Sequence, residues 1–367
     1  MSALATAAGT GHLLYPAVLY LRTRRLKDEV PPDPDQWPAV TVAVAAYLEE
    51  EVIAAKVADA RDNGYPGPLE VLVVADDDAT AAAARASGAE VLSSGSRGGK
   101  ADAVNRAFAH ASTPIVVLTD ANTMLAPGSL TAMIRWFDDP SVGAVAGEKT
   151  VAGGEGAYWR FESWLKRREA LTGSTIGLVG ELTAVRQHVF RPLPPDLAVD
   201  DLWLALDVRE QGKRIVYEPT ARAAEEASPH WRAEWQRRTR VVSGVLDVIW
   251  RRRGLLSPRY GSLAAQLWGH RLMRSSIGPI AHLMLVLAAV HTRRRSTLAQ
   301  LTVWFHLVGA VAAVRGQRRV RQVTLERLVG QTLFLQAVAI GGIVRYLRRD
   351  RPALWPKPRR VASSVSL

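Results

Sequence analysis

The 367-residue sequence carries 47 Lys and Arg against 35 Asp and Glu, which gives a formal net charge of +12. It has no cysteine, and this excludes a disulfide framework and a thiolate metal site. The arginines gather beside apolar segments rather than in a nucleic-acid-binding motif. We therefore expect membrane lipids with anionic headgroups as partners, and no nucleic acid.

The N-terminal segment, residues 1–22, is apolar and is followed by further basic residues of the run RTRRLK. A signal peptide has its positive charge before the apolar region, whereas here the charge follows it. Residues 1–22 are therefore predicted to be a membrane anchor whose basic flank lies in the cytoplasm.

Residues 39–230 are predicted to form an α/β domain, because short apolar runs alternate with segments of helical periodicity. This alternation is typical of a parallel, doubly wound sheet. Three of the runs end in polar residues, and ligands bind where such strand ends meet at one sheet edge. The three polar stretches are Tyr47–Glu49, Asp76–Asp78 and Asp120–Asn122.

Two nucleotide-binding motifs can be set aside. The segment SGSRGGKA imitates a P-loop, but Ser94 replaces its first glycine and Ala101 replaces the hydroxyl residue that binds Mg²⁺. No G-x-G-x-x-G follows the first apolar run, so a dinucleotide-binding Rossmann site is not predicted. A phosphate-bearing ligand here would need another set of contacts.

The order and spacing of four segments resemble those of family 2 inverting glycosyltransferases with the GT-A fold: VAVAAYLEEEVI, VLVVADDDAT, RGGKADAVNRAFAHA and VVLTDANT. The likeness covers nearly the whole chain and is closest to the membrane-bound branch that includes polysaccharide synthases. It implies a Rossmann-like, doubly wound GT-A catalytic domain with transmembrane helices on its N-terminal and C-terminal sides.

The resemblance also implies a divalent cation, Mg²⁺ or Mn²⁺, because a hard cation on oxygen ligands neutralises the departing diphosphate of a nucleotide-sugar donor. Asp120 stands at the first position of the family's D-x-D motif and is the expected metal ligand. Asn122 stands at the second position, where the family has Asp, and its carbonyl oxygen is expected to orient the metal or the sugar. Taken alone, Asp120 could equally begin a turn.

The resemblance assigns the nucleotide pocket as well. Asp76 matches the carboxylate that holds the base of a uridine-type nucleotide. The backbone around Ala46 and Tyr47, together with Glu49, is expected to line the same pocket. Lys100 is expected to contact the diphosphate or the nucleotide, and its alternative is a solvated lysine at a helix start.

The segment VDDLWLALDVREQG has the apolar spacing of a helix that ends at Gly212. Asp200 is predicted to be its N-cap, which would bind amides of the first turn. In the resembling family the second acid of this pair is the general base that deprotonates the acceptor hydroxyl. Asp201 is therefore the predicted catalytic residue, and a second helix-end charge is its alternative.

The segment QRRTR stands where processive cellulose- and hyaluronan-type synthases show Gln-x-x-Arg-Trp. Thr239 and Arg240 replace the Arg and the Trp, so an aromatic platform for a growing chain is not evident. The residues that we expect to reach phosphate or the acceptor are Asp200, Gln236, Arg237 and Arg238.

The C-terminal third is predicted to be membrane-associated. Residues 231–275 alternate apolar residues with arginines, as amphipathic interfacial helices do. Three crossings within 276–347 would export the basic tail, 348–367, against the positive-inside tendency, so we expect one stretch to lie in the interface or re-enter. The candidate spans, each near the roughly 20 residues that a bilayer requires, are 276–291, 298–314 and 328–347, the last with the Gly341-Gly342 pair.

These features together predict a multi-pass membrane enzyme with a cytoplasmic catalytic domain. It would transfer a sugar, with inversion, from a nucleotide-diphosphate donor to a lipid or polysaccharide acceptor. One alternative is a single transfer onto a polyprenyl-phosphate carrier. Another, from a different class, is a catalytically inactive homologue that serves as a membrane scaffold, which Asn122 and the altered QRRTR segment keep open.

Overall fold

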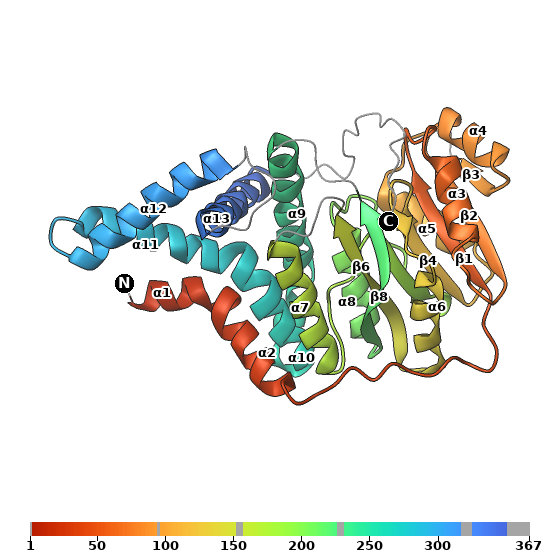
Figure 1. Ribbon diagram of the computed structural model, residues 1–367, viewed down its shortest axis with the longest axis horizontal. Helices are drawn as coiled ribbons and strands as arrows, with labels where there is room; N and C mark the ends of the chain where they lie inside the picture. Colours follow the sequence, from red (N-terminus) through yellow and green to blue (C-terminus); the bar gives the residue numbers. More distant parts are fainter. Residues whose placement is uncertain (1, 94–95, 152–156, 226–230, 317–324, 351–367) are drawn as a thin grey trace. The chain divides into compact units, whose positions relative to one another are not determined.

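The computed structural model describes residues 2–93, 96–151, 157–225, 231–316 and 325–350 (Figure 1). These residues form two compact units. Residues 23–225 make up the first, which we call the sheet unit, and residues 2–22 with 231–350 make up the second, which we call the helical unit. Most of the predicted basic tail, residues 351–367, lies outside the described residues.

The sheet unit contains an eight-stranded sheet with the strand order β3-β2-β1-β4-β7-β6-β8-β5. Strands β1, β2, β3 and β4 are parallel neighbours, whereas β7 runs antiparallel to both β4 and β6, and β5 runs antiparallel to β8. The predicted all-parallel sheet is therefore wrong, and the sheet is mixed. The strands are β1 Val40–Ala46, β2 Leu69–Ala75, β3 Glu90–Ser93, β4 Ile115–Asp120, β5 Met124–Leu125, β6 Val142–Val151, β7 Leu182–Arg186 and β8 Arg214–Glu225.

The predicted strands β1 to β4 are confirmed. Their side chains alternate between the two faces of the sheet, which explains why helices cover both faces. Val40, Val42 and Val44 point into a core with α3, α4 and α6. The intervening residues of β1, Ala43 and Ala45, line a small cavity with α5. The helices of this unit are α3 Ile53–Arg61, α4 Asp78–Ala86, α5 Lys100–His110, α6 Ser129–Ile134, α7 Ala157–Leu171 and α8 Asp200–Glu210, with single turns at Arg135–Asp138 and Gln187–Val189.

Helix α8 corrects one expectation about its N-terminus. Asp200 is the first helical residue, the N-cap position is Val199, and no side-chain cap bond is made there. The acid that binds a first-turn amide is Asp201, whose Oδ1 accepts from the Leu202 amide at 2.7 Å. The predicted end at Gly212 is confirmed, because this glycine has a φ of +75° just after the helix.

The helical unit consists of helices from both ends of the chain (Figure 1). Its longer elements are α9, α11, α12 and α13, and two stretches, η1 and η6, are π-helical. The elements are α1 Ser2–Gly9, η1 Thr10–Leu14, α2 Tyr15–Thr23, α9 Trp231–Arg251, η4 Arg253–Leu256, η5 Pro258–Tyr260, α10 Ser262–Gln266, η6 Leu267–Ile277, α11 Gly278–Thr292, α12 Thr297–Gly316 and α13 Leu325–Leu347.

The Gly341-Gly342 pair lies inside the continuous helix α13 rather than in a break. Its lack of side chains allows α9 to approach, since a Cβ on Gly342 would come within 2.5 Å of Val242 and one on Gly341 within 2.9 Å of Trp235. Close helix packing therefore explains this pair without a re-entrant turn.

Within the described residues, one continuous helical stretch is long and apolar enough to cross a membrane, Ser262–Thr292. A second apolar segment, Thr297–Val311, is shorter. The first contains the predicted span 276–291, whereas the predicted anchor at 1–22 and the other two spans are not confirmed.

Candidate active site

The candidate site lies at the ends of several strands of the sheet unit. Asp120 is the last residue of β4, and Asn122 follows it in the turn that leads to β5. Glu225 is the last residue of β8, Lys149 lies near the end of β6, and Glu181 directly precedes β7. Strands that are distant in the sequence therefore deliver opposite charges to one place.

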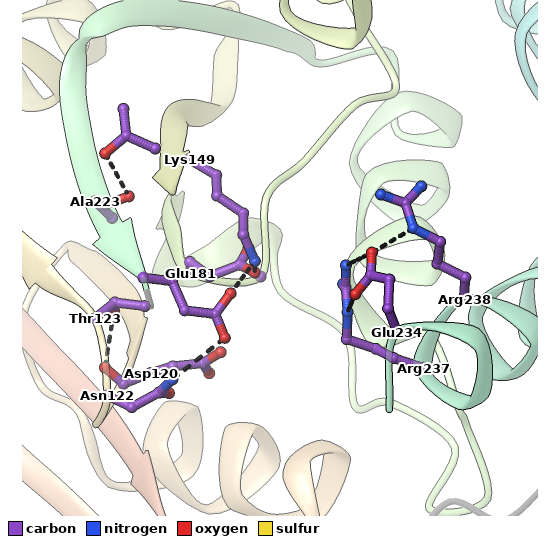
Figure 2. Close-up of polar contacts among 12 residues, drawn as sticks. Asp120, Asn122, Thr123, Lys149, Glu181, Ala223, Glu234, Arg237 and Arg238 are labelled. Carbon is purple, nitrogen blue, oxygen red and sulfur yellow. Dashed lines mark hydrogen bonds and ion pairs between the residues drawn. The ribbon is translucent and has the colours of Figure 1, made fainter. Parts of the chain in front are cut away.

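Lys100, the first residue of α5, ties this helix to the end of β4. Its ammonium group donates to Asp120 Oδ1 at 2.6 Å and to the carbonyl oxygen of Gly180 at 3.0 Å. The Asp120 turn is itself closed by Thr123, whose hydroxyl donates to the Asp120 carbonyl at 2.9 Å (Figure 2). Lys100 thus begins α5, and its ammonium group is paired with Asp120.

Lys149 forms the second charged centre and is almost fully buried, with 6% of its side chain exposed. Its ammonium group makes short ion pairs with both Glu181 and Glu225. Glu225 uses its other oxygen, Oε1, to accept from Asn122 Nδ2 at 3.3 Å. Figure 2 shows Lys149 and Glu181 beside the turn that holds Asp120 and Asn122.

The electrostatics link the two lysines. Burial opposes the charge of Lys100, but the carboxylates of Asp120, Asp200 and Glu181 raise its pKa above the ordinary value. Burial likewise favours a neutral Glu181, but Lys149 and then Lys100 lower its pKa below the ordinary value. Since Glu181 interacts with both ammonium groups, the two lysines and their carboxylate partners form one electrostatic network.

This network carries more carboxylates than ammonium groups, which bears on whether it suits a divalent cation. Its acids are Asp120, Asp200, Glu181 and Glu225, against Lys100 and Lys149. No group of three or more His, Cys, Asp or Glu in the described part of the chain is arranged to hold a metal. Mg²⁺ in such sites often uses one or two carboxylates and takes its other ligands from phosphates and water. The excess negative charge and the oxygen atoms of Asp120 and Asn122 fit that arrangement.

Asp76 supports the glycine turn that leads into α5. Its Oδ2 accepts from the amides of Gly98 and Gly99 at 3.0 and 2.8 Å, and its Oδ1 accepts from Arg106 at 2.5 Å. The Asp76 side chain is 5% exposed. Both of its oxygens are therefore engaged by its own chain, and the turn that it holds places Lys100 at the site.

The neighbouring donor-pocket candidates follow β1. Ala46 is buried, and its carbonyl oxygen accepts from the Asp76 amide at 3.0 Å. The ring of Tyr47 lies 4.2 Å from the Arg97 guanidinium carbon. Glu49 is also buried, and its amide donates to the Thr80 hydroxyl at 2.9 Å. Asp77 is a structural residue, because it caps α4 by accepting from the Thr80 amide at 2.9 Å.

The two acids of α8 differ in their surroundings. Asp200 contributes to the raised pKa of Lys100, so its carboxylate acts on the Lys100–Asp120 pair. Asp201 accepts from the Leu202 amide and is half-buried. Asp200 is thus one of the acids that act on the charged network.

The QRRTR residues lie on α9 in the helical unit. Glu234 binds Arg237 at 2.9 Å and also forms a short bond with Arg238, as Figure 2 shows, whereas Gln236 is exposed. Burial favours a neutral Glu234, but hydrogen bonds and charges from the two arginines lower its pKa to about 2. Both arginines are therefore held by an ionised partner within their own helix.

The site residues predicted from the sequence did not include Lys149, Glu181 or Glu225. Each adjoins an apolar strand, which is the same signal that identified Asp120, but two of these strands end after an interruption of the apolar pattern. In β6 and β8 the register shifts between Ala146 and Glu148, so the charged ends are displaced from the apolar runs. A search for charged residues within a few positions of every strand end could have found them.

Comparisons with known proteins agree with this fold. A family model described as "Glycosyltransferase like family 2" matches residues 38–244. The beta-monoglucosyldiacylglycerol synthase of Synechocystis sp. is 27% identical over an alignment of 173 residues. The match covers 42% of this chain and 35% of that protein, so this chain spans about a third of the relative's length.

Among solved structures, a mannosyltransferase from Pyrobaculum calidifontis in complex with GDP-Man and Mn²⁺ matches with a TM-score of 0.76 and 26% identity. That match covers 94% of this chain and 98% of the other. The family model includes all eight strands and extends over more than half of the sequence. The chain therefore belongs to glycosyltransferase family 2 and has the α/β fold of its GT-A enzymes.

Proposed function

We propose that this glycosyltransferase moves a sugar, with inversion, from a nucleotide-diphosphate donor to a lipid or polysaccharide acceptor at the cytoplasmic face of a membrane. The observation that carries the proposal is the charged network at the strand ends, with its excess of carboxylates around Lys100 and Asp120. A bound Mg²⁺ or Mn²⁺ would supply positive charge that neutralises the departing diphosphate.

The residues of this chain have distinct roles in the proposed transfer. Lys100 binds the diphosphate and orients it, while Asp120 and Asn122 provide oxygen atoms for the cation. The acceptor oxygen bonds to the anomeric carbon as the bond from that carbon to the diphosphate oxygen breaks. Asp201 takes the proton of the acceptor hydroxyl, and the nucleoside diphosphate leaves with the electron pair.

The remaining assigned residues bind the two substrates. Asp76, Ala46, Tyr47 and Glu49 form the nucleotide pocket, in which Asp76 also holds the Gly98-Gly99 turn. The residues proposed to reach phosphate or the acceptor are Asp200, Gln236, Arg237 and Arg238.

A lipid acceptor is supported by two observations. The helical unit exposes large apolar side chains, for example Leu298 at 67% and Trp304 at 65%. The Synechocystis relative is, by its name, a synthase of a glucosylated diacylglycerol. These observations favour an acceptor that resides in the membrane, although the match to that relative is partial.

A single transfer to a polyprenyl-phosphate carrier is a second candidate, and the local structure at Thr239 favours it. Thr239 replaces an arginine of the processive motif, is buried, and donates to the Gln236 carbonyl at 3.2 Å. This position therefore serves helix packing and does not present a charge to a growing glycan.

The proposal is tested by nucleotide release from purified full-length protein in detergent. Several nucleotide sugars are supplied with Mn²⁺, Mg²⁺ or a chelator, each with and without a membrane-lipid extract. We expect release that depends on the cation for one donor class, and its stimulation by the lipid extract. Absence of release and of donor binding under every condition would favour the inactive scaffold instead.

A further inference from the structure

The second position of the D-x-D-like motif is the uncharged Asn122, and the carboxylate of Glu225 lies beside it. Asn122 Nδ2 lies 3.3 Å from Glu225 Oε1, and the other carboxylate oxygen of Glu225 pairs with Lys149. Glu225 comes from the end of β8, about a hundred residues later in the sequence. A carboxylate is therefore present next to this motif position, but another strand supplies it.

This contact requires an amide at position 122. A carboxylate there would meet the Glu225 carboxylate at the same separation. Two ionised carboxylates at that separation repel each other, and neither has a hydrogen to donate to the other. The amide instead donates a hydrogen bond to Glu225 and has a neutral oxygen as its remaining polar atom.

We propose that Glu225 is a positioning residue for Asn122 and that the two form a matched pair. Glu225 engages the nitrogen of the amide, so that its oxygen is the atom left for the cation or the sugar of the donor. The single negative charge of the pair resides on β8, and Lys149 holds it in place. The inference rests on the proposed function only for the identity of the ligand that the oxygen meets.

The pair allows an exchange that conserves charge. Asn122→Asp alone places two carboxylates in contact, and Glu225→Gln alone turns an amide nitrogen toward Asn122 or Lys149, both of which are donors. Combining them restores complementarity, because the new glutamine can accept from Lys149 and donate to the new carboxylate. The net charge of the double variant equals that of the parent.

The first measurement is thermal unfolding of the full-length protein in detergent. Each single variant should lower the transition midpoint of the sheet unit by about 2–4 °C, and the double variant should regain most of that loss. Asn105→Asp is the matched control, because the Asn105 amide lies away from Glu225 and bonds to the Leu193 backbone, donating at 2.9 Å and accepting at 2.7 Å. Asn105→Asp should lower the transition midpoint by the same amount in the parent protein and in Glu225→Gln.

The second measurement is the affinity for Mn²⁺ alone, followed by the electron paramagnetic resonance signal of the free ion. The double variant moves the charge from position 225 to position 122, and it should bind Mn²⁺ about tenfold more tightly than the parent if position 122 faces the ligand. Glu225→Gln alone should bind it more weakly than the parent. Unchanged Mn²⁺ affinity in a stable double variant would contradict the positioning role.

Additive midpoint losses in the two single variants and the double variant would overturn the pairing. If Asn122→Asp does not fold, the deciding comparison is Glu225→Gln against the double variant, which must be the more stable of the two. Neither measurement requires sugar transfer. A protein that shows the coupling but releases no nucleotide would therefore refute the proposed function and leave this inference standing.

Discussion

The sheet unit and the helical unit place the same residue types in opposite surroundings. In the sheet unit, strand residues such as Val44 and Val117 are fully buried. In the helical unit, the first part of α12 exposes apolar residues, including Leu301 at 61% and Phe305 at 53%. Soluble proteins rarely expose large contiguous apolar surfaces, and these exposed residues are therefore a reason to propose that the helical unit contacts a membrane.

Charged residues show the reverse arrangement. The sheet unit buries lysines and neutralises each with carboxylates, as at Lys149 and at Lys166, which binds Glu148 at 3.1 Å. Buried charges of this kind are retained at a cost in desolvation and are common at functional sites. The sheet unit thus holds a buried polar site, whereas the helical unit has apolar side chains on its surface.

The largest expected effect comes from placing one charge in each unit. Val117→Asp buries an unpaired carboxylate in β4 between β1 and β7, and it should cost more than about 4 kcal/mol and prevent folding. Leu301→Asp should leave the sheet unit folded but weaken membrane insertion by about 3 kcal/mol. Thermal unfolding and the fraction retained on membranes after alkaline carbonate washing measure the two effects.

Unfolding of the sheet unit in Leu301→Asp would contradict the claim that the two units place apolar residues in different surroundings. Release of the parent protein from membranes by carbonate without detergent would contradict membrane insertion of the helical unit.

The next largest effect is expected at Asp201, and it separates catalysis from donor binding. Asp201→Asn removes the proposed base, so turnover should fall about 10²–10⁴-fold while donor affinity is kept. Asp200→Asn should instead weaken donor binding, because Asp200 stabilises the charge of Lys100. Steady-state kinetics with nucleotide binding as a check on folding distinguish kcat from KM effects.

A reversed result, in which Asp200→Asn loses turnover and Asp201→Asn does not, would exchange the two roles.

Asp120→Ala is expected to have a smaller effect, on donor binding. It removes the charged partner of Lys100 and the proposed cation ligand, so affinity for the donor with Mn²⁺ should fall about 10–100-fold. Asn122→Ala removes a neutral oxygen and should have a milder effect. Titration calorimetry that finds unchanged metal-assisted affinity in Asp120→Ala would remove this residue from the site.

Much of the sheet unit could be predicted from local patterns. Apolar runs with polar ends identified β1, β2 and β4. These predictions succeeded because strand burial and turn chemistry depend on a few adjacent residues. The same reasoning placed Asp120 at the end of a buried strand, where it is found.

The rest depended on pairings between distant strands. The antiparallel course of β7, and the meeting of Lys149, Glu181 and Glu225, follow from strand order, which a local pattern does not contain. The expected N-cap role of Asp200 failed for a finer reason, since the helix begins one residue earlier than predicted. Apolar runs likewise do not distinguish a helix face that is exposed from one that packs against another helix. Gly341 and Gly342 illustrate this, because they allow α9 to pack against α13.

The smallest effect is expected in the helical unit, which also contains well-paired acids, among them Glu234 with Arg237 and Asp247 with Arg251. Glu234 has a lowered pKa, so its contribution to stability is present above the unfolded value near 4.5 and is lost as pH falls toward about 2. Allowing for partial solvent contact, the loss should be on the order of 1–2 kcal/mol. Thermal midpoints of the full-length protein from pH 6 to pH 2.5 should show a drop that Glu234→Gln lacks, whereas Glu29→Gln at an exposed site should follow the parent curve. Since Glu234 holds Arg237 and Arg238, the same drop would report the release of the arginines proposed to reach phosphate. A parent curve that coincides with that of Glu234→Gln over this range would show that the ion pairs on α9 do not stabilise the helix, and that its arginines are held by packing alone.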